Sequence, residues 1–309
     1  MHFGGNTEQI LHMMADFMGN HVGFGKLTGS LKFILELLIK RQIDIYLLIT
    51  GAIKWPHRRL AEATACIGAL RVDDGLGRLV ILDDLRPHIV DIGAESSRPG
   101  AHPVAARDEA ERLLPVVEAL RDCGVPVSVD TVKPEVMRAV LAAGADMIND
   151  INALRAPGAL EVVATTRAGI CLMHMQGKPT TMQSDPQYDD VVAEVAGFLG
   201  ERVAAAEAAG IAFNRITVDP GFGFGKSLEH NIELLRRLGE LVVPGLPLLV
   251  GMSRKSMLGL ITGRAAPERV HAGIAAHMLA VLRGARILRV HDVAATRDAL
   301  AVLQAVEDY

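Results

Sequence analysis

The stretch Ile216-Thr-Val-Asp-Pro-Gly-Phe-Gly-Phe-Gly-Lys226 joins a short β-prone run to a glycine-rich turn, and a helical pattern starts near Ser227. Its closely spaced glycines let the backbone approach a bound molecule and adopt positive φ. Asp219 stands where the strand ends, Phe224 offers a flat apolar face and Lys226 supplies a cation. By itself, such a loop is also typical of a plain turn with a solvated lysine. The pattern gains meaning because a polar residue at the end of a strand recurs along the chain.

From residue 88 onward, short apolar runs alternate with helical patterns. The runs predict strands at 88–93, 126–130, 147–150, 169–174, 216–219, 246–251 and 287–291. The helical patterns lie at 106–123, 134–143, 189–209, 228–238, 267–283 and 294–306. Strands that are buried on both faces and alternate with helices favour a parallel sheet. Seven such strands, with an eighth available at 43–50, predict an α/β fold, the closed (β/α)8 TIM barrel.

A doubly wound open sheet is the competing architecture. It is disfavoured because no dinucleotide-binding fingerprint follows the first strand, and because polar residues end nearly every strand instead of lining one crevice. Residues 1–87 do not show the alternation, so the chain divides into an atypical N-terminal segment, 1–87, and the barrel, 88–309. We expect the N-terminal segment to supply the first strand and helix of the barrel.

Composition excludes several classes of protein. The chain has 309 residues, a formal net charge of −4 and a pI near 6.3, which indicates neither nucleic acid nor an anionic membrane as a partner. Its three cysteines are widely spaced, which argues against a disulfide framework or a zinc site. No secretory signal is visible, and the apolar run at 45–53 is far below the ~20 residues that span a bilayer. We therefore expect a cytoplasmic protein.

In a barrel, the carboxyl ends of the strands meet at one mouth, where active sites are built. Any one polar residue there is more often a cap than a catalytic group, but the whole set predicts a polar pocket. The residues at the strand ends are Asp91, Asp130, Asn149, Asp150, His174, Asp219, Ser253 to Lys255, Arg289 and His291.

The chemistry of this set suggests its ligand. Asp130, Asn149 and Asp219 suit a flat heterocycle that bears amide and amino groups. A phosphate or diphosphate suits the cationic and neutral donors of Arg254, Lys255, Arg289 and His291. No arrangement of serine or cysteine with histidine is evident, and no cluster around His174 completes a metal site. A reaction that expels diphosphate with the help of oriented cations fits better than covalent catalysis.

These blocks resemble bacterial dihydropteroate synthase in sequence and in order, over roughly residues 88 to 305. The blocks are Asp91-Ile-Gly-Ala-Glu-Ser-Ser-Arg-Pro-Gly100, Ser128-Val-Asp-Thr131, Ile148-Asn-Asp150, Met173-His-Met-Gln-Gly-Lys-Pro179, Asp219 to Lys226, Ser253-Arg-Lys-Ser256 and Arg289-Val-His-Asp-Val293. The resemblance implies a TIM-barrel transferase of folate biosynthesis that is cytoplasmic and homodimeric, with sulfonamides as candidate inhibitors; sensitivity or resistance depends on details of the p-aminobenzoate slot. It would join 6-hydroxymethyl-7,8-dihydropterin diphosphate to p-aminobenzoate, giving 7,8-dihydropteroate and diphosphate with the help of Mg²⁺.

The resemblance also implies roles for matching positions. The pterin ring would be bound by Asp130, Asn149, Asp219 and Lys255, with Met173 on its face. Arg289 and His291 would hold the diphosphate, and Phe224 and Ser256 would line the p-aminobenzoate slot. Ser97 and Arg98 lie on a loop that helps to order the site, and Ser97 stands where threonine is usual. The catalytic set would be Lys255, Arg289, His291 and Asp219, and the metal ligands stay unassigned.

The N-terminal segment departs from the family. The usual first strand and loop, approximately Gly-Ile-Leu-Asn-Val-Thr-Pro-Asp-Ser-Phe-Ser-Asp-Gly-Gly, carries an asparagine for Mg²⁺ and diphosphate, and nothing in 1–87 matches it. An alternative function follows, that of a pterin-binding protein with little or no catalysis. A pterin-binding methyltransferase is a third hypothesis, which the blocks at Ser253–Ser256 and Arg289–Val293 disfavour.

Overall fold

Eight strands form one sheet that closes into a barrel. The computed structural model describes residues 44–50, 71–73, 79–81, 88–96, 103–122 and 124–307. The strand order is β8-β7-β6-β5-β4-β1-β10-β9, and a parallel bridge between Val218 and Leu248 joins the two ends of that order. The strands are β1 (Asp44–Thr50), β4 (Ile89–Gly93), β5 (Val127–Asp130), β6 (Met147–Asp150), β7 (Gly169–Met173), β8 (Ile216–Asp219), β9 (Leu249–Val250) and β10 (Ile287–Val290). The predicted barrel is confirmed, and all eight predicted strands are present.

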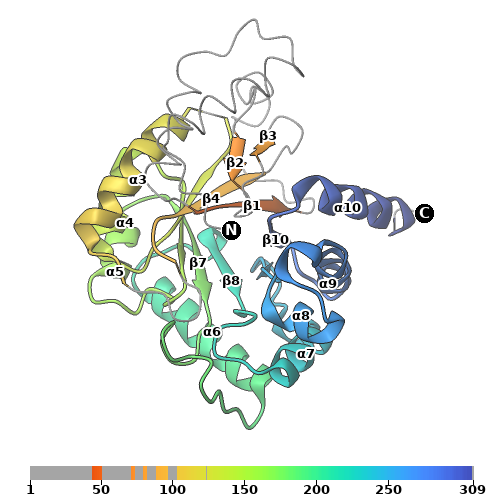
Figure 1. The fold of residues 1–309 in the computed structure, drawn as a ribbon. Helices are drawn as coiled ribbons and strands as arrows, with labels where there is room; N and C mark the ends of the chain where they lie inside the picture. The colour runs from red at the N-terminus through yellow and green to blue at the C-terminus, as the bar shows by residue number, and fades with distance from the viewer. Residues whose placement is uncertain are drawn as a thin grey trace, which may run out of the picture.

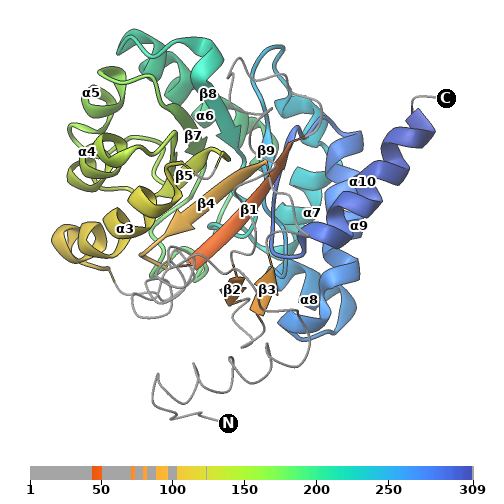
Figure 2. The same ribbon diagram turned by 90° about the horizontal axis from the view of Figure 1, so that it is seen from above.

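One strand runs against the others. β4 to β10 pair in parallel wherever they are neighbours, but β1 pairs antiparallel with both β4 and β10. Figure 2 shows β1 lying beside β4. In this register Asp44 lies opposite Gly93, so the amino end of β1 is at the mouth. The expectation that 43–50 supplies a strand of the ring holds, whereas the expectation of an entirely parallel sheet is wrong at this strand.

Helices surround the strands (Figure 1). They are α3 (Ala106–Leu120), α4 (Pro134–Ala143), α5 (Ala159–Ala164), α6 (Val191–Ala208), α7 (Leu228–Arg236), α8 (Ser256–Thr262), α9 (Val270–Leu282) and α10 (Val293–Glu307). The six predicted helices are present, and α5 and α8 are additional. These two are shorter than the window in which helical periodicity becomes visible. The helix expected from the N-terminal segment lies outside the described residues. Within that segment, the structure describes only β1 and a small antiparallel pair, β2 (Arg71–Asp73) and β3 (Leu79–Ile81).

Alternation along each strand builds two cores. The outward residues pack under the helices in one large apolar cluster, with Ile92, Ile148 and Ile170 among its fully buried members. At the closed end of the barrel, inward residues form a small apolar plug. The plug consists of Ile89, Met147, Cys171, Leu249 and Ile287. Since side chains alternate with a period of two, the next inward residue lies two positions nearer the mouth.

Above the plug, the inward positions are polar. Two residues beyond Ile89, Met147 and Ile287 lie Asp91, Asn149 and Arg289. Asp130 and Asp219 end their own strands and are also buried. The architecture therefore brings residues that are far apart in sequence into one polar layer below the mouth.

Candidate active site

Arg289 lies at the centre of the polar layer. Its Nη2 is 2.9 Å from Asp91 Oδ2 and donates to Asp130 Oδ2, also at 2.9 Å. Burial raises the pKa of Asp130 to about 6, and the charge of Arg289 opposes this rise. The single guanidinium thus bridges two buried carboxylates, which makes its burial and theirs mutually dependent.

Asn149 neighbours Asp130 across the β5–β6 pair, and its amide is turned toward Asp91. Asn149 Nδ2 donates to Asp91 Oδ2 at 3.4 Å. Its Oδ1 is buried and has no hydrogen-bond partner among the described residues. This oxygen is therefore available to a ligand. Asp150, also at this strand end, accepts from the backbone N–H groups of Asn152 and Leu154 and serves as a turn cap.

Asp219 and Lys255 form the opposite side of the layer. Asp219 is buried and accepts from the Gly221 N–H at 2.7 Å. Burial raises the pKa of Asp219, and Lys255 opposes this rise. Burial also lowers the pKa of Lys255 to about 8, although Asp219 acts in the other direction. Lys255 Nζ donates to the Phe222 carbonyl and lies 4.7 Å from the centroid of the Phe224 ring.

The loop between β9 and α8 is tied to the end of β10. Ser253 Oγ lies 2.9 Å from His291 Nδ1 and accepts from the His291 N–H at 3.3 Å. Arg254 has a φ of 58°, in the left-handed region, and its Nη2 is 2.7 Å from Asp292 Oδ1. These contacts bring Lys255 and His291 to one side of the mouth. Ser256 begins α8 and is exposed.

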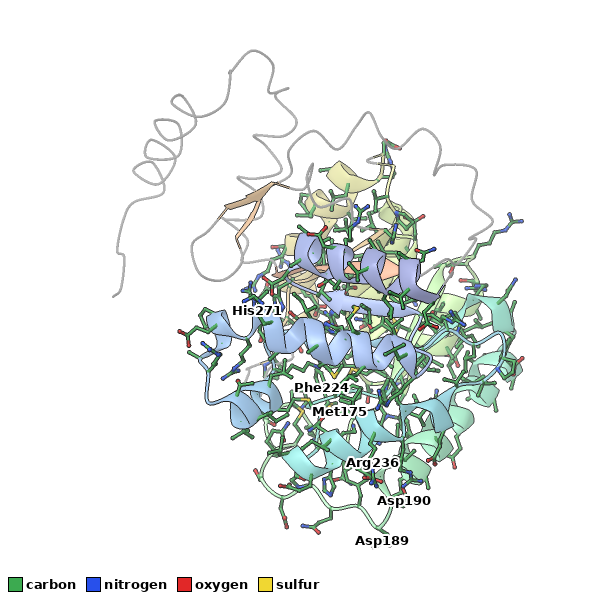
Figure 3. The ribbon with its side chains drawn as sticks, turned by 90° about the vertical axis from the view of Figure 1, so that its right-hand side faces the viewer. Met175, Asp189, Asp190, Phe224, Arg236 and His271 are labelled. Carbon is green, nitrogen blue, oxygen red and sulfur yellow. The ribbon has the colours of Figure 1, made fainter. Side chains whose placement is uncertain are left out.

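An apolar wall completes the mouth. Met173 and Phe224 belong to one buried cluster, together with Met175 and Met182. Figure 3 shows Met175 and Phe224 next to each other. Sulfur-containing and aromatic side chains of this kind present a flat, polarizable surface that suits a planar ring.

The glycine-rich loop folds back over the end of β7. A Cβ on Gly221 would lie 1.9 Å from the His174 carbonyl oxygen, and a Cβ on Gly225 would lie 2.3 Å from the Gln176 carbonyl oxygen. Both glycines also have positive φ. The loop can therefore pass this close to β7 only with glycine at these positions.

Lys226 is buried beneath this loop. Its Nζ donates to the carbonyls of Gly221 and Phe224 at 3.0 and 3.2 Å and lies 2.9 Å from His174 Nδ1. Burial lowers the pKa of Lys226 to about 7 and that of His174 to about 3. Lys226 is therefore neither a solvated lysine nor a cation that faces a ligand. Lys226 and His174 instead hold the loop from inside, a role that the sequence pattern did not predict.

A second, partly buried ionic cluster lies where β4 leads into α3. Lys133 contacts the carboxylates of both Glu95 and Glu109, and Glu95 Oε2 accepts from the Val104 N–H at 2.8 Å. This cluster closes the base of the loop that carries Ser97 and Arg98, and those two residues lie outside the described part of the chain. The sequence signal for the cluster was an acidic residue, Glu109, on the apolar side of a predicted helix.

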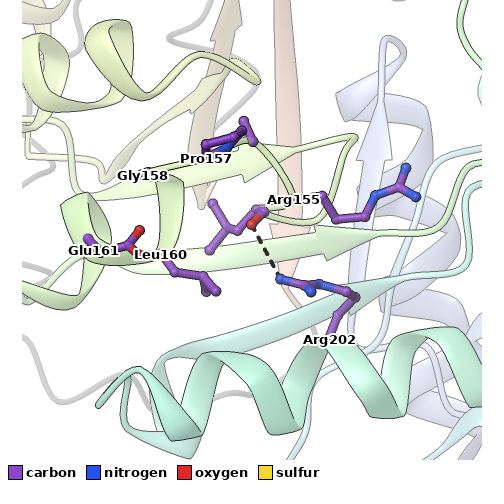
Figure 4. A pocket seen from close by; sticks show the side chains of 8 residues that line it. Arg155, Pro157, Gly158, Leu160, Glu161 and Arg202 are labelled. Atoms are coloured by element: carbon purple, nitrogen blue, oxygen red, sulfur yellow. Dashed lines mark hydrogen bonds between the residues drawn. The ribbon is translucent and has the colours of Figure 1, made fainter.

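Among the described residues, no group of three or more His, Cys, Asp or Glu side chains could hold a metal ion, and no helix is long and apolar enough to cross a membrane. A surface hollow of about 280 Å³ lies beside α5 (Figure 4). It shares no residue with the polar layer, and Arg202 uses its guanidinium on the carbonyls of Ala153 and Leu154.

Comparison with known proteins identifies the class. Residues 87–291 match the family described as pterin binding enzyme. Dihydropteroate synthase from Escherichia coli is 51% identical over 218 residues, which cover 70% of this chain and 77% of that protein. The crystal structure of Burkholderia cenocepacia dihydropteroate synthase with 7,8-dihydropteroate has a TM-score of 0.69 at 53% identity, covering 72% of this chain and 82% of that one. The Yersinia pestis enzyme in a sulfonamide drug complex has a TM-score of 0.70 at 47% identity, with the same coverages.

The chain belongs to the pterin binding enzymes, because residues 87–291 match that family and its barrel resembles the barrel of a solved member. Within that class it belongs to the dihydropteroate synthases, the transferases of folate biosynthesis. The resemblance seen in the sequence blocks is therefore confirmed.

The glycine-rich loop yields a first prediction. Gly221 and Gly223 both have positive φ, but a Cβ on Gly223 would meet nothing nearer than Lys255 Cδ at 3.4 Å. Gly223→Ala should therefore lower the free energy of unfolding only by the strain of a left-handed alanine, ~1–2 kcal/mol. Gly221→Ala must in addition displace the β7 backbone and should lower the melting temperature by at least twice as much. Differential scanning calorimetry of both variants measures this, and equal shifts would contradict the packing described.

Lys226 yields a second prediction, on pH. Between about pH 7 and about pH 10, the lysine keeps its proton in the unfolded chain and has lost it in the folded chain, so the free energy of unfolding rises with pH. Lys226→Met should reduce that slope by up to ~1.4 kcal/mol per pH unit. Urea unfolding across this range measures the slope, with the exposed Lys178→Met as the control. A slope unchanged in Lys226→Met would show that the buried amine keeps its ordinary pKa.

Proposed function

We propose that the mouth of this barrel joins 6-hydroxymethyl-7,8-dihydropterin diphosphate to p-aminobenzoate. The observation that carries the proposal is the juxtaposition, in one layer, of buried carboxylate and amide acceptors with the partly buried cations Lys255 and Arg289. A pterin ring offers amino and N–H donors to such acceptors, and a diphosphate offers oxygens to such cations. The Burkholderia cenocepacia homologue, solved with 7,8-dihydropteroate, supports the same product for this chain.

The ring would be read by Asp130, Asn149 and Asp219, with Met173 against its face. Each of the three polar residues is buried, so its hydrogen bonds to the ring form away from water and discriminate strongly against rings that lack the donors. Lys255 is 4.7 Å from the Phe224 ring, and this supports a place for Lys255 between the pterin and the p-aminobenzoate slot formed by Phe224 and Ser256.

The bond change is a substitution at the methylene carbon on the pterin. The bond from that carbon to the diphosphate oxygen breaks with its electron pair on oxygen, and the amine of p-aminobenzoate forms the new carbon–nitrogen bond and then loses a proton. Arg289 and His291 would stabilise the charge that develops on the leaving diphosphate, a stabilisation that preorganised cations provide in a dry site. Acceptors around the ring would stabilise the positive charge left on the pterin.

Mg²⁺ is part of the proposal only as a companion of the diphosphate. The described residues hold no preformed cage for it, and Asp91 and Asp130 are already paired with Arg289. Mg²⁺ is commonly held by few protein ligands together with substrate phosphates. Ser97 and Arg98 would act from the loop based at Glu95 and Lys133. Sulfonamides would compete for the p-aminobenzoate slot, as the Yersinia pestis complex suggests.

We also propose that the reaction takes place in the cytoplasm, and the buried free thiol of Cys171 accords with this.

The test is diphosphate release by the purified full chain with both substrates, in the presence and absence of Mg²⁺. Lys255→Ala should lower the rate by ~10²–10³, the usual cost of removing one preorganised donor to a transition state. Lys178→Ala, which removes an exposed lysine, should retain the wild-type rate. If the wild-type chain binds the pterin diphosphate but releases no diphosphate, the alternative holds and the protein binds pterin with little or no catalysis.

We further propose that the chain forms a homodimer through α9 and α10. These helices pack against each other and expose Leu279, Leu282, Val302 and Val306. Exposed apolar side chains on adjacent helices are typical of a contact between protein subunits, and a two-fold contact uses the same surface on both copies.

The dimer is tested by the double variant Leu282→Glu, Val302→Glu. Placing charges on this surface should convert the protein from dimer to monomer in sedimentation velocity experiments. The matched control is Ala142→Glu, an exposed residue on α4 across the ring, which should leave the dimer intact (Figure 1). A wild-type chain that sediments as a monomer would refute this proposal without affecting the proposed reaction.

A further inference from the structure

Asp91 is the one carboxylate of the polar layer that lies below the others. It occupies the middle of β4, where its neighbours in sequence are Val90 and Ile92, and its side chain is fully buried. Its Oδ2 receives Arg289 and Asn149, while its Oδ1 has no hydrogen-bond partner among the described residues. Burying such an ionic cluster is costly, and apolar residues in place of all its members are often as stable or more stable. The position therefore calls for a function other than stability.

We propose that Asp91 is a positioning residue that sets which groups the pocket presents to the pterin ring. This inference rests on the proposed function. An ionised carboxylate can only accept hydrogen bonds, so the amide beside it must turn its nitrogen toward it. In Asn149 that orientation directs Nδ2 to Asp91 and leaves Oδ1 on the opposite edge of the amide, buried and available.

The orientation of Asn149 matters because its neighbours are also acceptors. Asp130 pairs with Asn149 in the β5–β6 register, and Asp219 completes the set. With Asn149 held by Asp91, the pocket presents three acceptors, which suits a ring edge rich in amino and N–H groups. Without Asp91, the Asn149 amide could turn, and the pocket would also accept a ring edge that bears an oxo group.

Asp91 also holds Arg289 independently of Asp130. In the structure Arg289 Nη2 is 2.9 Å from an oxygen of each carboxylate. When a ring donates hydrogen bonds to Asp130, that carboxylate binds the guanidinium of Arg289 more weakly, and Asp91 keeps Arg289 in place. Asp91 thus acts on both halves of the substrate through other residues, without touching either half.

The test is a double-mutant cycle on ring binding. Isothermal titration calorimetry uses 6-hydroxymethylpterin, which has no phosphate. Its affinity therefore reports ring binding through Asn149 and not diphosphate binding through Arg289. We expect Asp91→Asn to weaken binding by about tenfold, because one buried hydrogen bond is worth ~1–1.5 kcal/mol and tenfold is ~1.4 kcal/mol. In the Asn149→Ala background, Asp91→Asn should have almost no further effect, since no amide remains to be oriented.

A second readout separates positioning from general damage. The matching lumazine has an oxo group in place of the 2-amino group, so its binding edge carries a different order of donors and acceptors. Asp91→Asn should reduce the preference for the pterin over the lumazine by several-fold, whereas a loosened fold would weaken both ligands alike. Asp190→Asn is the control, because the Asp190 carboxylate caps the start of α6 and pairs with Arg237 outside the polar layer, and it should leave the preference unchanged.

Three outcomes are decisive. Additive losses in the cycle, or an unchanged pterin preference in Asp91→Asn, overturn the inference while leaving the proposed function in place. If Asp91→Asn does not fold, Asp91→Ser, which is smaller and still polar, is measured in its place against the same expectations. A wild-type chain that does not bind 6-hydroxymethylpterin at all removes the proposed function, and this inference fails with it.

Discussion

The structure depends on the sharing of Arg289 between Asp91 and Asp130. A barrel interior that contains three aspartates within one layer could not be buried without cations, because each uncompensated charge would cost several kcal/mol. Arg289 enters from β10 and pairs with the carboxylates of β4 and β5, and Lys255 comes from the loop after β9, next to the strand β8 that carries Asp219. The groups proposed to bind the substrate are therefore also the groups that make the polar interior tolerable. Stability and function are set here by the same few contacts.

That arrangement leaves buried polar groups incompletely paired, and a ligand can supply their missing partners. Asn149 Oδ1 lacks a partner among the described residues, and burial raises the pKa of Asp130 while it lowers that of Lys255. A ring that donates hydrogen bonds to these acceptors, and a diphosphate that pairs with the cations, would supply what the protein alone does not. Unpaired buried polar atoms are uncommon in folded proteins and concentrate where a ligand completes them. The tight loop beneath Phe224, held by Lys226 from inside, keeps the apolar wall in place meanwhile.

Much of this was readable from sequence, for a physical reason. Strands buried on both faces appear as short apolar runs, and inward residues above the plug must be polar if a site is present, so the strands and the polar layer could be located together. Three features could not. The direction of β1 is invisible because alternation has the same period in either direction along a strand. Burial of Lys226 depends on a loop that folds back on β7, and the pairing of Lys133 with Glu95 and Glu109 joins residues that no local pattern links.

The reversal of β1 need not disturb the site. Asp130, Asn149, Asp219, Lys255 and Arg289 all come from the parallel strands β5 to β10 and the loops that follow them. β1 contributes to the ring by pairing its two edges with β4 and β10, and an antiparallel strand satisfies those backbone groups as well as a parallel one. What the reversal changes is connectivity, since the amino end of β1, instead of its carboxyl end, meets the mouth opposite Gly93. The acceptors proposed to read the ring stand on β5, β6 and β8, and none of these strands pairs with β1, so the reversal leaves their place in the sheet unchanged.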